Sequence, residues 1–407
     1  MAFEIKNNLL EKYIGIGDDE RVVIPDNITH IDRFAFHNCS GIISIEIPES
    51  VISIGSGAFF GCKNLTSITL PKGLKELGGG TFNGCASIKE IIIPDGIKEI
   101  DTATFKNCMS LESISIPKCI KKIGECAFEN CESLAEISIP DTVEEIHGTA
   151  FANTKWYKDF EGDFVIIGRN ILYKYRGTEE NVVISDNVTT ISTEAFSNNE
   201  TMKSVIIPDS VTSIGFHTFS GCINLVDVKF PANIRDIGVG AFDGTKWLDD
   251  YDGDFIIIGK DILYRYTGKE NDVVIPKKVV HIAAFAFSGC EKLKSVLFHD
   301  SVVSIGRGAF DSCTSLKSIV LPKAITSINS WTFCGCEKLE EVVIPETVTE
   351  ILDGAFEGCK KLKKINIPDS VEYFGEGVFE DCKKLVKINY RDKIYDNVDN
   401  FESSILE

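Results

Sequence analysis

The chain has 407 residues and a formal net charge of −19, from 42 Lys and Arg against 61 Asp and Glu. No basic segment is long enough to neutralise a row of phosphates, and no apolar run approaches the roughly 18 residues of a membrane span, so nucleic acid and membrane insertion are excluded as general interactions. Residues 1–8 lack the basic start and apolar core of a signal peptide. We therefore expect a cytoplasmic protein, or a surface or secreted one if an export segment has been trimmed.

Residues 1–24 are predicted to form an N-terminal cap. The pattern Phe3-x-Ile5, followed by residues 8–15 and then Val22-Val23-Ile24, recurs in longer form over residues 164–184. The exposed end of a stack of strands needs a cover, because unpaired strand edges invite aggregation. We expect this segment to cover the first coil.

Residues 25–390 repeat one unit of 23 residues. All twelve prolines of the chain occupy one column of this unit, and Ser185 and His299 fill that column in two further copies. Eleven of the thirteen intervals between successive copies are 23 residues long, and the other two are 45. A fixed period of this size indicates a solenoid rather than a compact globule. We expect one elongated solenoid domain over residues 1–407, with 1–24 and 391–407 as its caps.

Each unit is interpreted as one coil of that solenoid. Residues such as 65–70 alternate apolar and polar side chains, which predicts a strand ended by Pro71. A short extended piece then carries Val51 and Ile54 in the second copy, and residues 58–62 predict a helical turn. Eleven residues after the proline column, every copy has a phenylalanine, expected to fill the core as a single spine. These are Phe36, Phe59, Phe82, Phe105, Phe128, Phe151, Phe196, Phe219, Phe242, Phe287, Phe310, Phe333, Phe356 and Phe379.

The consensus L-x-x-I-x-I-P-x-x-V-x-x-I-G-x-x-A-F-x-x-C-x-x-L resembles the BspA-like leucine-rich repeat family over about residues 22–390. The resemblance implies a right-handed stack of coils, with a parallel β-sheet on one face and short helical turns and loops on the other. It also implies a bacterial or protist interaction protein, and adhesion is one of the functions implied.

Two longer segments, residues 154–184 and 245–275, account for the 45-residue intervals. They share the pattern T-K-W-x-x-D-x-x-G-D-F-x-I-I-G-x-x-I-L-Y-x-Y-x-G. We favour a degenerate coil built from two strands joined at residues 168–170 and 259–261. A hairpin projecting from the solenoid is the alternative.

Eleven of the fourteen cysteines fall in one column of the repeat, where Thr154, Asn199 and Thr245 fill the gaps. An odd number of cysteines that exchange with Thr and Asn predicts small buried residues rather than disulfides, and hence free thiols in a reducing compartment. Cys334-Gly335-Cys336 lacks the second pair that a zinc site needs. The acidic run Asp250 to Asp254 lacks the downstream glutamate of a calcium loop. We therefore predict no metal and no cofactor.

The sequence carries no catalytic motif. The six histidines show no H-E-x-x-H spacing, and neither G-x-S-x-G nor a phosphate-binding loop is present. Repeat solenoids bind through their surfaces, so we predict that the chain is not an enzyme.

The outward positions of the strands suggest a binding surface. Ile92, Ile206, Leu297, Val320 and Val343 stand where other copies have polar residues, and the last three lie on consecutive coils. Adjoining exposed apolar residues indicate a partner site, although cross-strand packing alone could also favour them.

Lysines gather on the coils that follow these apolar positions. They are Lys360, Lys361, Lys363, Lys364, Lys383 and Lys384, at matching positions of adjacent coils. We predict a non-catalytic, monomeric scaffold that binds a protein or peptide at Leu297, Val320 and Val343, with these lysines at the rim. The alternative is a bacterial cell-surface adhesin that binds host protein or glycan. The tail, residues 391–407, predicts a short helix over residues 401–406 capped by Asn400.

Overall fold

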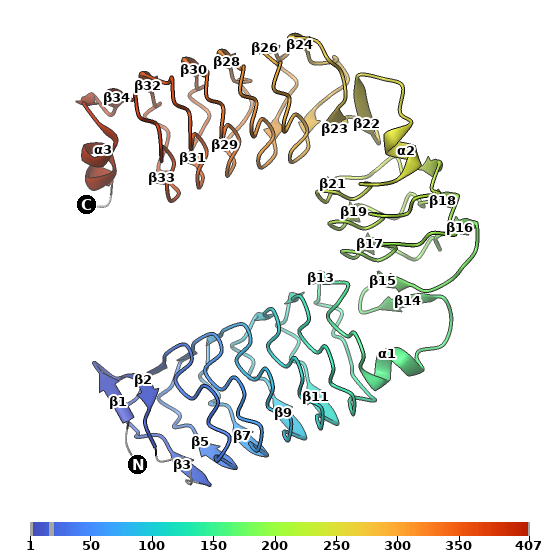
Figure 1. Ribbon diagram of the computed structural model, residues 1–407, viewed down its shortest axis with the longest axis vertical. Helices are drawn as coiled ribbons and strands as arrows, with labels where there is room; N and C mark the ends of the chain where they lie inside the picture. The colour runs from blue at the N-terminus through green and yellow to red at the C-terminus, as the bar shows by residue number, and fades with distance from the viewer. Residues whose placement is uncertain (1–2, 16–19, 406–407) are drawn as a thin grey trace. The chain divides into compact units, whose positions relative to one another are not determined.

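The computed structural model describes residues 3–15 and 20–405 (Figure 1). The chain divides into two compact units. Unit 1 comprises Met1–Asp227 and Gly240–Lys246, and unit 2 comprises Val228–Val239 and Trp247–Glu407. Both units are built from the predicted coils, each of which runs once around a shared apolar core.

Three-residue strands of successive coils form the predicted parallel sheet, called the long-strand ladder below. In each of these strands the middle side chain points into the core, and the two flanking side chains face outward. The strands are β3 (Arg21–Val23), β5 (Ser44–Glu46), β7 (Ser67–Thr69), β9 (Glu90–Ile92), β11 (Ser113–Ser115), β16 (Asn181–Val183), β18 (Ser204–Ile206), β20 (Asp227–Lys229), β24 (Asp272–Val274), β26 (Ser295–Leu297), β28 (Ser318–Val320), β30 (Glu341–Val343), β32 (Lys364–Asn366) and the longer β34 (Lys387–Tyr390).

The short extended pieces that follow the proline column form a second parallel ladder, the short-strand ladder. In unit 2 the two ladders lie on opposite sides of the coils (Figure 1). The short strands are β4 (His30–Ile31), β6 (Ser53–Ile54), β8 (Glu76–Leu77), β10 (Glu99–Ile100), β12 (Lys122–Ile123), β13 (Glu145–Ile146), β17 (Thr190–Ile191), β19 (Ser213–Ile214), β21 (Asp236–Ile237), β25 (His281–Ile282), β27 (Ser304–Ile305), β29 (Ser327–Ile328), β31 (Glu350–Ile351) and β33 (Tyr373–Phe374).

Three antiparallel hairpins interrupt the regular coils: β1 (Phe3–Lys6) with β2 (Leu9–Tyr13), β14 (Phe164–Ile167) with β15 (Ile171–Tyr175), and β22 (Phe255–Ile258) with β23 (Ile262–Tyr266). In all three the register shifts between the second and third residues of the first strand and leaves one extra residue in the second strand, which confirms that they are copies of one another. The second strand of each hairpin pairs in parallel with the next short strand. The longer segments are therefore built into the stack rather than projecting from it, as the favoured interpretation expected. Short helices α1 (Lys155–Asp159) and α2 (Lys246–Asp249) precede the second and third hairpins.

The phenylalanine column fills the core, but it is not one spine. From Phe36 to Phe151 the rings of successive coils stack with centroids 5.2–5.6 Å apart. At the second hairpin, Trp156 and Tyr173 meet Phe151 edge-on instead. The prediction of a single spine is wrong there, because the hairpin has no turn that could carry a phenylalanine.

A tyrosine from the second strand of each hairpin begins a new column of rings. Tyr13, Tyr175 and Tyr266 each pack on the next phenylalanine at 5.1–5.3 Å. The second hairpin thus ends one aromatic column and starts the next, and the first and third hairpins each start a column.

The segment that carries each phenylalanine is a pair of stacked turns, not the predicted helical turn. The backbone N–H of Phe36 donates to the carbonyl of Ala58 in the next coil at 2.7 Å, while Phe34 and Asn38 on either side have φ of 58° and 59°. The N–H groups of Phe34, Phe36 and Asn38 point along the stack to the next coil. Those of the residues between them, Ala35 and His37, bond to carbonyls three residues back. Glycine suits position 57 in particular, because φ there is 64° and a Cβ would lie 2.5 Å from the ring of Phe34 in the preceding coil.

All fourteen cysteines are free thiols, nine of them buried and five half-buried. In the repeat column the Sγ of Cys62 donates to the carbonyl of Phe36 at 3.1 Å, and the same bond recurs at Cys108, Cys222 and Cys359. Thr154, which replaces a cysteine, donates instead to the carbonyl of Phe151 at 2.8 Å. The column therefore places a small hydrogen-bond donor beside the phenylalanine turn, which explains why Cys and Thr exchange there.

The C-terminal end is covered by β35 (Lys393–Tyr395) and α3 (Val398–Ile405). Phe401 is buried and packs edge-on against Phe374 and Phe379. The predicted cap residue is wrong. The helix begins at Val398, and the side-chain oxygen of Asn397 accepts from the backbone N–H of Asn400 at 2.7 Å. The predicted helix end at Leu406 lies outside the described residues. With eight residues, α3 is the longest described helix, and no described helix can cross a membrane.

Candidate protein-binding site

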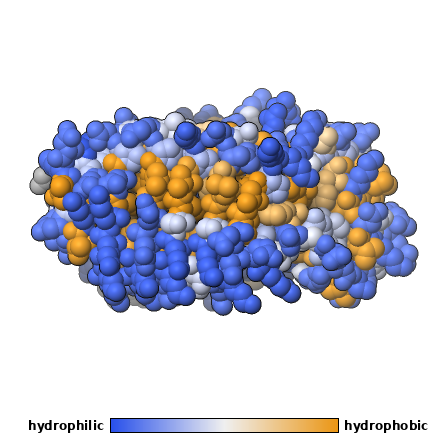
Figure 2. Space-filling view, turned by 90° about the horizontal axis from the view of Figure 1, so that it is seen from above, coloured by the Kyte–Doolittle hydropathy of each residue, from blue (hydrophilic) through white to orange (hydrophobic). Residues whose placement is uncertain are grey.

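Four outward side chains of unit 2 form what we call the apolar row. Val274, Leu297, Val320 and Val343 occupy the same position in β24, β26, β28 and β30, and their exposed fractions are 64%, 64%, 62% and 45%. Val274 lies opposite Leu297, and Val320 lies opposite Val343. Figure 2 views the molecule from the side on which these strands lie in Figure 1, and it shows an apolar band flanked on both sides by hydrophilic residues.

The three residues predicted to form the site are therefore brought together, and a fourth joins them. Val274 escaped the sequence prediction although Val273-Val274-Ile275-Pro276 follows the same strand pattern as the other copies. Strand alternation therefore predicts an outward side chain at Val274 as well. The position was missed because this strand follows one of the long segments rather than a regular coil.

Unit 1 has no row of this length within its described residues. Ile92 is 73% exposed, yet its neighbours on the adjacent coils are the exposed polar residues Thr69 and Ser115. Val183 and Ile206 adjoin one another as a pair. Single exposed apolar residues are ordinary protein surface, whereas a continuous row is not.

The predicted lysines follow the apolar row, but the structure divides them into two groups. Three have acidic partners: Lys360 pairs with Glu337 at 2.6 Å, Lys361 with Glu340 at 3.9 Å, and Lys383 with Asp381 at 3.5 Å. Lys363, Lys364 and Lys384 form no ion pair with the part of the chain that the structure describes. These three ammonium groups are available for a partner, and so are those of exposed Lys294 and Lys317, which precede β26 and β28 and form no ion pair with a described residue.

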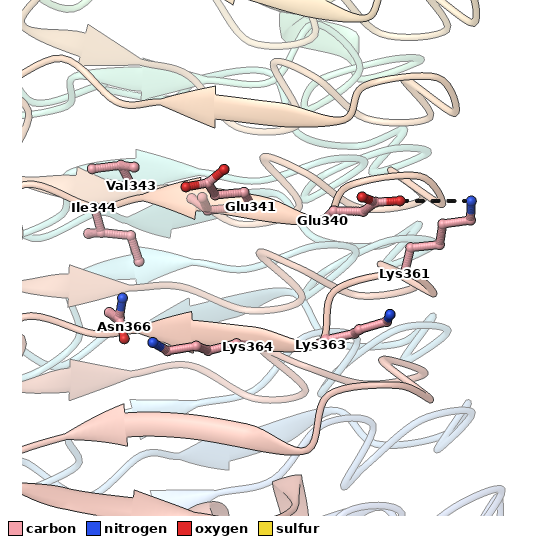
Figure 3. Close-up of a pocket in the computed structure, with 9 residues that line it drawn as sticks. Glu340, Glu341, Val343, Ile344, Lys361, Lys363, Lys364 and Asn366 are labelled. Carbon is pink, nitrogen blue, oxygen red and sulfur yellow. Dashed lines mark ion pairs between the residues drawn. The ribbon is translucent and has the colours of Figure 1, made fainter.

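A groove of about 510 Å³ lies between β30 and β32, beside the end of the apolar row. Glu340, Glu341 and Val343 line one wall, and Lys363, Lys364 and Asn366 line the other (Figure 3). At the groove, β30 belongs to one sheet with β28, and β32 belongs to another with β34; a similar break separates β26 from β28 within the apolar row. The long-strand ladder is thus interrupted where the groove opens.

One arrangement in unit 1 superficially resembles a nucleophile with its base. The sulfur of Cys126 lies 3.6 Å from the hydroxyl of Thr149, which lies 2.9 Å from Nδ1 of His147. Burial raises the pKa of the Cys126 thiol and lowers the pKa of His147. An activated cysteine needs the opposite shift of the thiol, so this arrangement does not fit nucleophilic catalysis. Within residues 3–15 and 20–405, no three His, Cys, Asp or Glu side chains form a metal cluster.

Several solved structures resemble the chain. A leucine rich cell surface protein from Faecalibacterium prausnitzii A2-165 is 28% identical, with 96% of this chain and 93% of that chain covered and a TM-score of 0.37. A leucine-rich repeat protein from Bacteroides ovatus ATCC 8483 is 24% identical, with 96% and 88% covered and a TM-score of 0.30. A leucine-rich repeat protein from Eubacterium ventriosum ATCC 27560 is 22% identical, with 92% and 88% covered and a TM-score of 0.31. No curated protein matches the chain significantly.

The family comparison covers most of the chain. The BspA type leucine rich repeat region matches residues 19–108, 98–174, 165–252 and 256–386. These ranges include both the regular coils and the two longer segments. The chain therefore belongs to the BspA type leucine-rich repeat family.

Proposed function

We propose that the chain is a non-catalytic scaffold that binds a protein segment on the long-strand face of unit 2. The apolar row carries this proposal: four consecutive coils present Val274, Leu297, Val320 and Val343 outward, each roughly half exposed or more. Water is displaced from this row when a partner's apolar side chains cover it, which favours association. Polar residues on both sides of the row give it the form of an interface core with a rim.

A protein partner fits this face better than nucleic acid does. The chain carries a net charge of −19, and Asp272 and Glu341 lie on the same face as the apolar row. A phosphate backbone would meet these carboxylates, whereas a protein segment can place apolar side chains over the row. Exposed lysines without an ion pair to a described residue lie along this face: Lys294 and Lys317 precede β26 and β28, and Lys363, Lys364 and Lys384 lie toward its C-terminal end. We therefore expect a partner whose surface is apolar with acidic residues beside the apolar part, most of them toward one end.

The test uses a displayed library of random peptides selected against the full chain. Binders are then measured against the double variant Val320→Glu/Val343→Glu. Two carboxylates in the centre of the row would be desolvated by an apolar partner, so we expect binding to weaken by about a hundredfold. Binders that show no dependence on Val320 and Val343 would remove the row as the binding site.

The matched control is Ile92→Glu, which makes the same kind of change on the same strand position in unit 1. Ile92 is 73% exposed and isolated among polar neighbours, so binding should be unaffected. Both variants should keep the melting temperature of the parent chain, because substitutions at exposed positions change stability by less than about 0.5 kcal/mol. A loss of binding that is accompanied by unfolding would be detected by that measurement.

The remaining sequence predictions concern where and in what form the scaffold acts. We propose that it acts as a monomer in the cytoplasm, a reducing compartment compatible with fourteen free thiols. The alternative, a cell-surface adhesin that binds host protein or glycan, stays a prediction. Labelling of intact cells with an antibody against the chain separates the two, since only a surface protein is labelled without permeabilisation.

A further inference from the structure

Opposite charges one coil apart form ion pairs along the long-strand face of unit 1. Lys89 and Glu112, which immediately precede β9 and β11, pair at 3.8 Å. Glu180 and Lys203, which immediately precede β16 and β18, pair at 2.8 Å. In both cases the two strands are hydrogen-bonded neighbours in one sheet. Residues at this position can therefore neutralise each other across hydrogen-bonded strands, although Lys317 and Glu340, which precede β28 and β30, form no ion pair with each other.

Unit 2 places opposite charges at the same position, yet they remain apart. Glu340 and Lys363 immediately precede β30 and β32, and the next residues, Glu341 and Lys364, are again of opposite charge. Neither couple forms an ion pair within the described residues; β30 and β32 belong to different sheets, and the groove lies between them (Figure 3). Glu340 is instead 3.9 Å from Lys361.

The consequence is a pair of unneutralised ammonium groups beside an apolar surface. Lys363 and Lys364 are exposed and lie on the β32 wall of the groove. Val343, the last residue of the apolar row, lies on the facing wall, and the buried side chain of Ile344 contributes to the lining (Figure 3). A group bound here would contact cations and the end of the apolar row together.

We propose that this groove takes the carboxylate of an Asp or Glu side chain of the partner segment whose apolar side chains cover the row. The proposal rests on the proposed function and assigns the partner's chemistry at one end of the site. A carboxylate bound over β32 would give Lys363 and Lys364 an acidic partner, which they lack among the described residues.

The opposite wall fixes where that carboxylate binds. Glu341 is exposed and has no ion pair with a described residue, so it repels an acidic group that approaches β30. The acidic residue is thereby confined to the β32 wall, and the partner's apolar side chains extend from there toward Val274. The site therefore selects the direction of the partner as well as its charge.

The test uses the peptides selected against the full chain that depend on Val320 and Val343. We expect them to carry Asp or Glu at one end of their apolar residues. The variant Lys363→Glu/Lys364→Glu should weaken their binding about tenfold. Replacing the peptide's acidic residues with Lys should restore binding to this variant while weakening binding to the parent chain. Raising the salt concentration should reduce the difference between parent and variant, because exposed charges are screened.

The matched control is Lys89→Glu/Lys203→Glu, which changes the charge by the same amount at the same strand position in unit 1. It should leave peptide binding unchanged, which separates a local carboxylate site from the effect of net charge. Peptides that depend on the apolar row, lack acidic residues and tolerate Lys363→Glu/Lys364→Glu would overturn the carboxylate site and leave the proposed function standing. A library that yields no row-dependent peptide would overturn both.

Discussion

The long-strand faces of unit 1 and unit 2 use one strand pattern for different surfaces. In unit 1 the outward residue is apolar in β3, β9, β16 and β18 and polar in β5, β7 and β11, so no more than two apolar residues adjoin, and exposed Ile92 stands alone between Thr69 and Ser115. In unit 2 four consecutive coils place an apolar residue at that position, from Val274 to Val343. The inward residues of the same strands are buried and apolar in both units. The repeat thus determines which residues form the core. The outward residues do not pack in the core, so they can differ between the units and determine whether the surface is polar or apolar.

The charges at the ends of these strands differ in the same way. Lys89 and Glu112 in unit 1 are paired across a continuous ladder. Glu340 and Lys363 in unit 2 stand at the equivalent position but face each other across a groove. Continuity of the ladder alone does not decide this pairing, because Lys317 and Glu340, which precede the hydrogen-bonded strands β28 and β30, form no ion pair with each other either.

The largest expected effects on the free energy of unfolding come from substitutions in the core, which is built in the same way in the two units. Phe128 and Phe310 are each fully buried between the rings of two adjacent coils. Phe128→Ala and Phe310→Ala should each lower the free energy of unfolding by about 3–5 kcal/mol in urea denaturation. The outward substitutions Ile92→Ala and Val320→Ala should change it by less than about 0.5 kcal/mol. If only one of the two core substitutions lowered the free energy of unfolding, the two columns of stacked rings would not be equivalent.

The buried thiols make the stability of both units depend on pH in the same direction, since burial raises the pKa of Cys313 and Cys336 in unit 2 as well as the pKa values of thiols in unit 1. Burial raises the pKa of Cys62 and of Cys131 to about 12, against 9.0 for an ordinary thiol. Between these values the unfolded chain loses protons that the folded chain keeps, so stability is full below pH 9 and falls as the pH rises toward 12. At pH 10 each such thiol should cost about 1.4 kcal/mol.

Urea denaturation of the parent chain and of Cys62→Thr/Cys131→Thr at pH 8 and pH 10 measures this effect. Thr is a suitable replacement because Thr154 and Thr245 occupy the same column naturally. The variant should lose less stability between the two pH values than the parent chain does. Equal losses would mean that the thiols ionise as readily in the folded chain as in the unfolded one.

The smallest expected effect is the coupling energy between oppositely charged residues that precede neighbouring strands. A double-mutant cycle on Lys89 and Glu112, both largely exposed, should give a coupling of about 0.2–1 kcal/mol. The same cycle on Glu340 and Lys363 should give a coupling close to zero. An equal coupling in both cycles would show that the groove walls close in solution and would weaken the comparison directly.

The fold could be predicted from the sequence because a single period fixes every buried column. The phenylalanines, the proline column and the free thiols all follow from it, and the two-strand interpretation of the longer segments is confirmed. The turns were misread because left-handed residues such as Phe34 and Cys126 are not glycine and so give no local signal. The break in the aromatic column could not be predicted, because the repeat pattern does not show that a hairpin replaces the phenylalanine turn there.

The candidate site could be predicted only in part. The positions of Leu297, Val320 and Val343 follow from strand alternation, and Val274 follows from the same rule. The groove does not follow from it, because the coils on either side of the interruption obey the same consensus as their neighbours. Sequence spacing alone predicts that Glu340 and Lys363 pair. The interruption of the ladder depends on how the coils pack and twist against one another, which the repeat pattern does not encode.

Methyl NMR of the chain labelled at Ile, Leu and Val tests the central claim most directly. A peptide selected against the full chain is titrated in, and the methyl signals of Val274, Leu297, Val320 and Val343 are followed together with that of Ile92. We predict that the four signals of the apolar row shift or broaden at the same peptide concentration while the Ile92 signal does not. Shifts at Ile92 with an unchanged apolar row would contradict the assignment of the binding surface to unit 2.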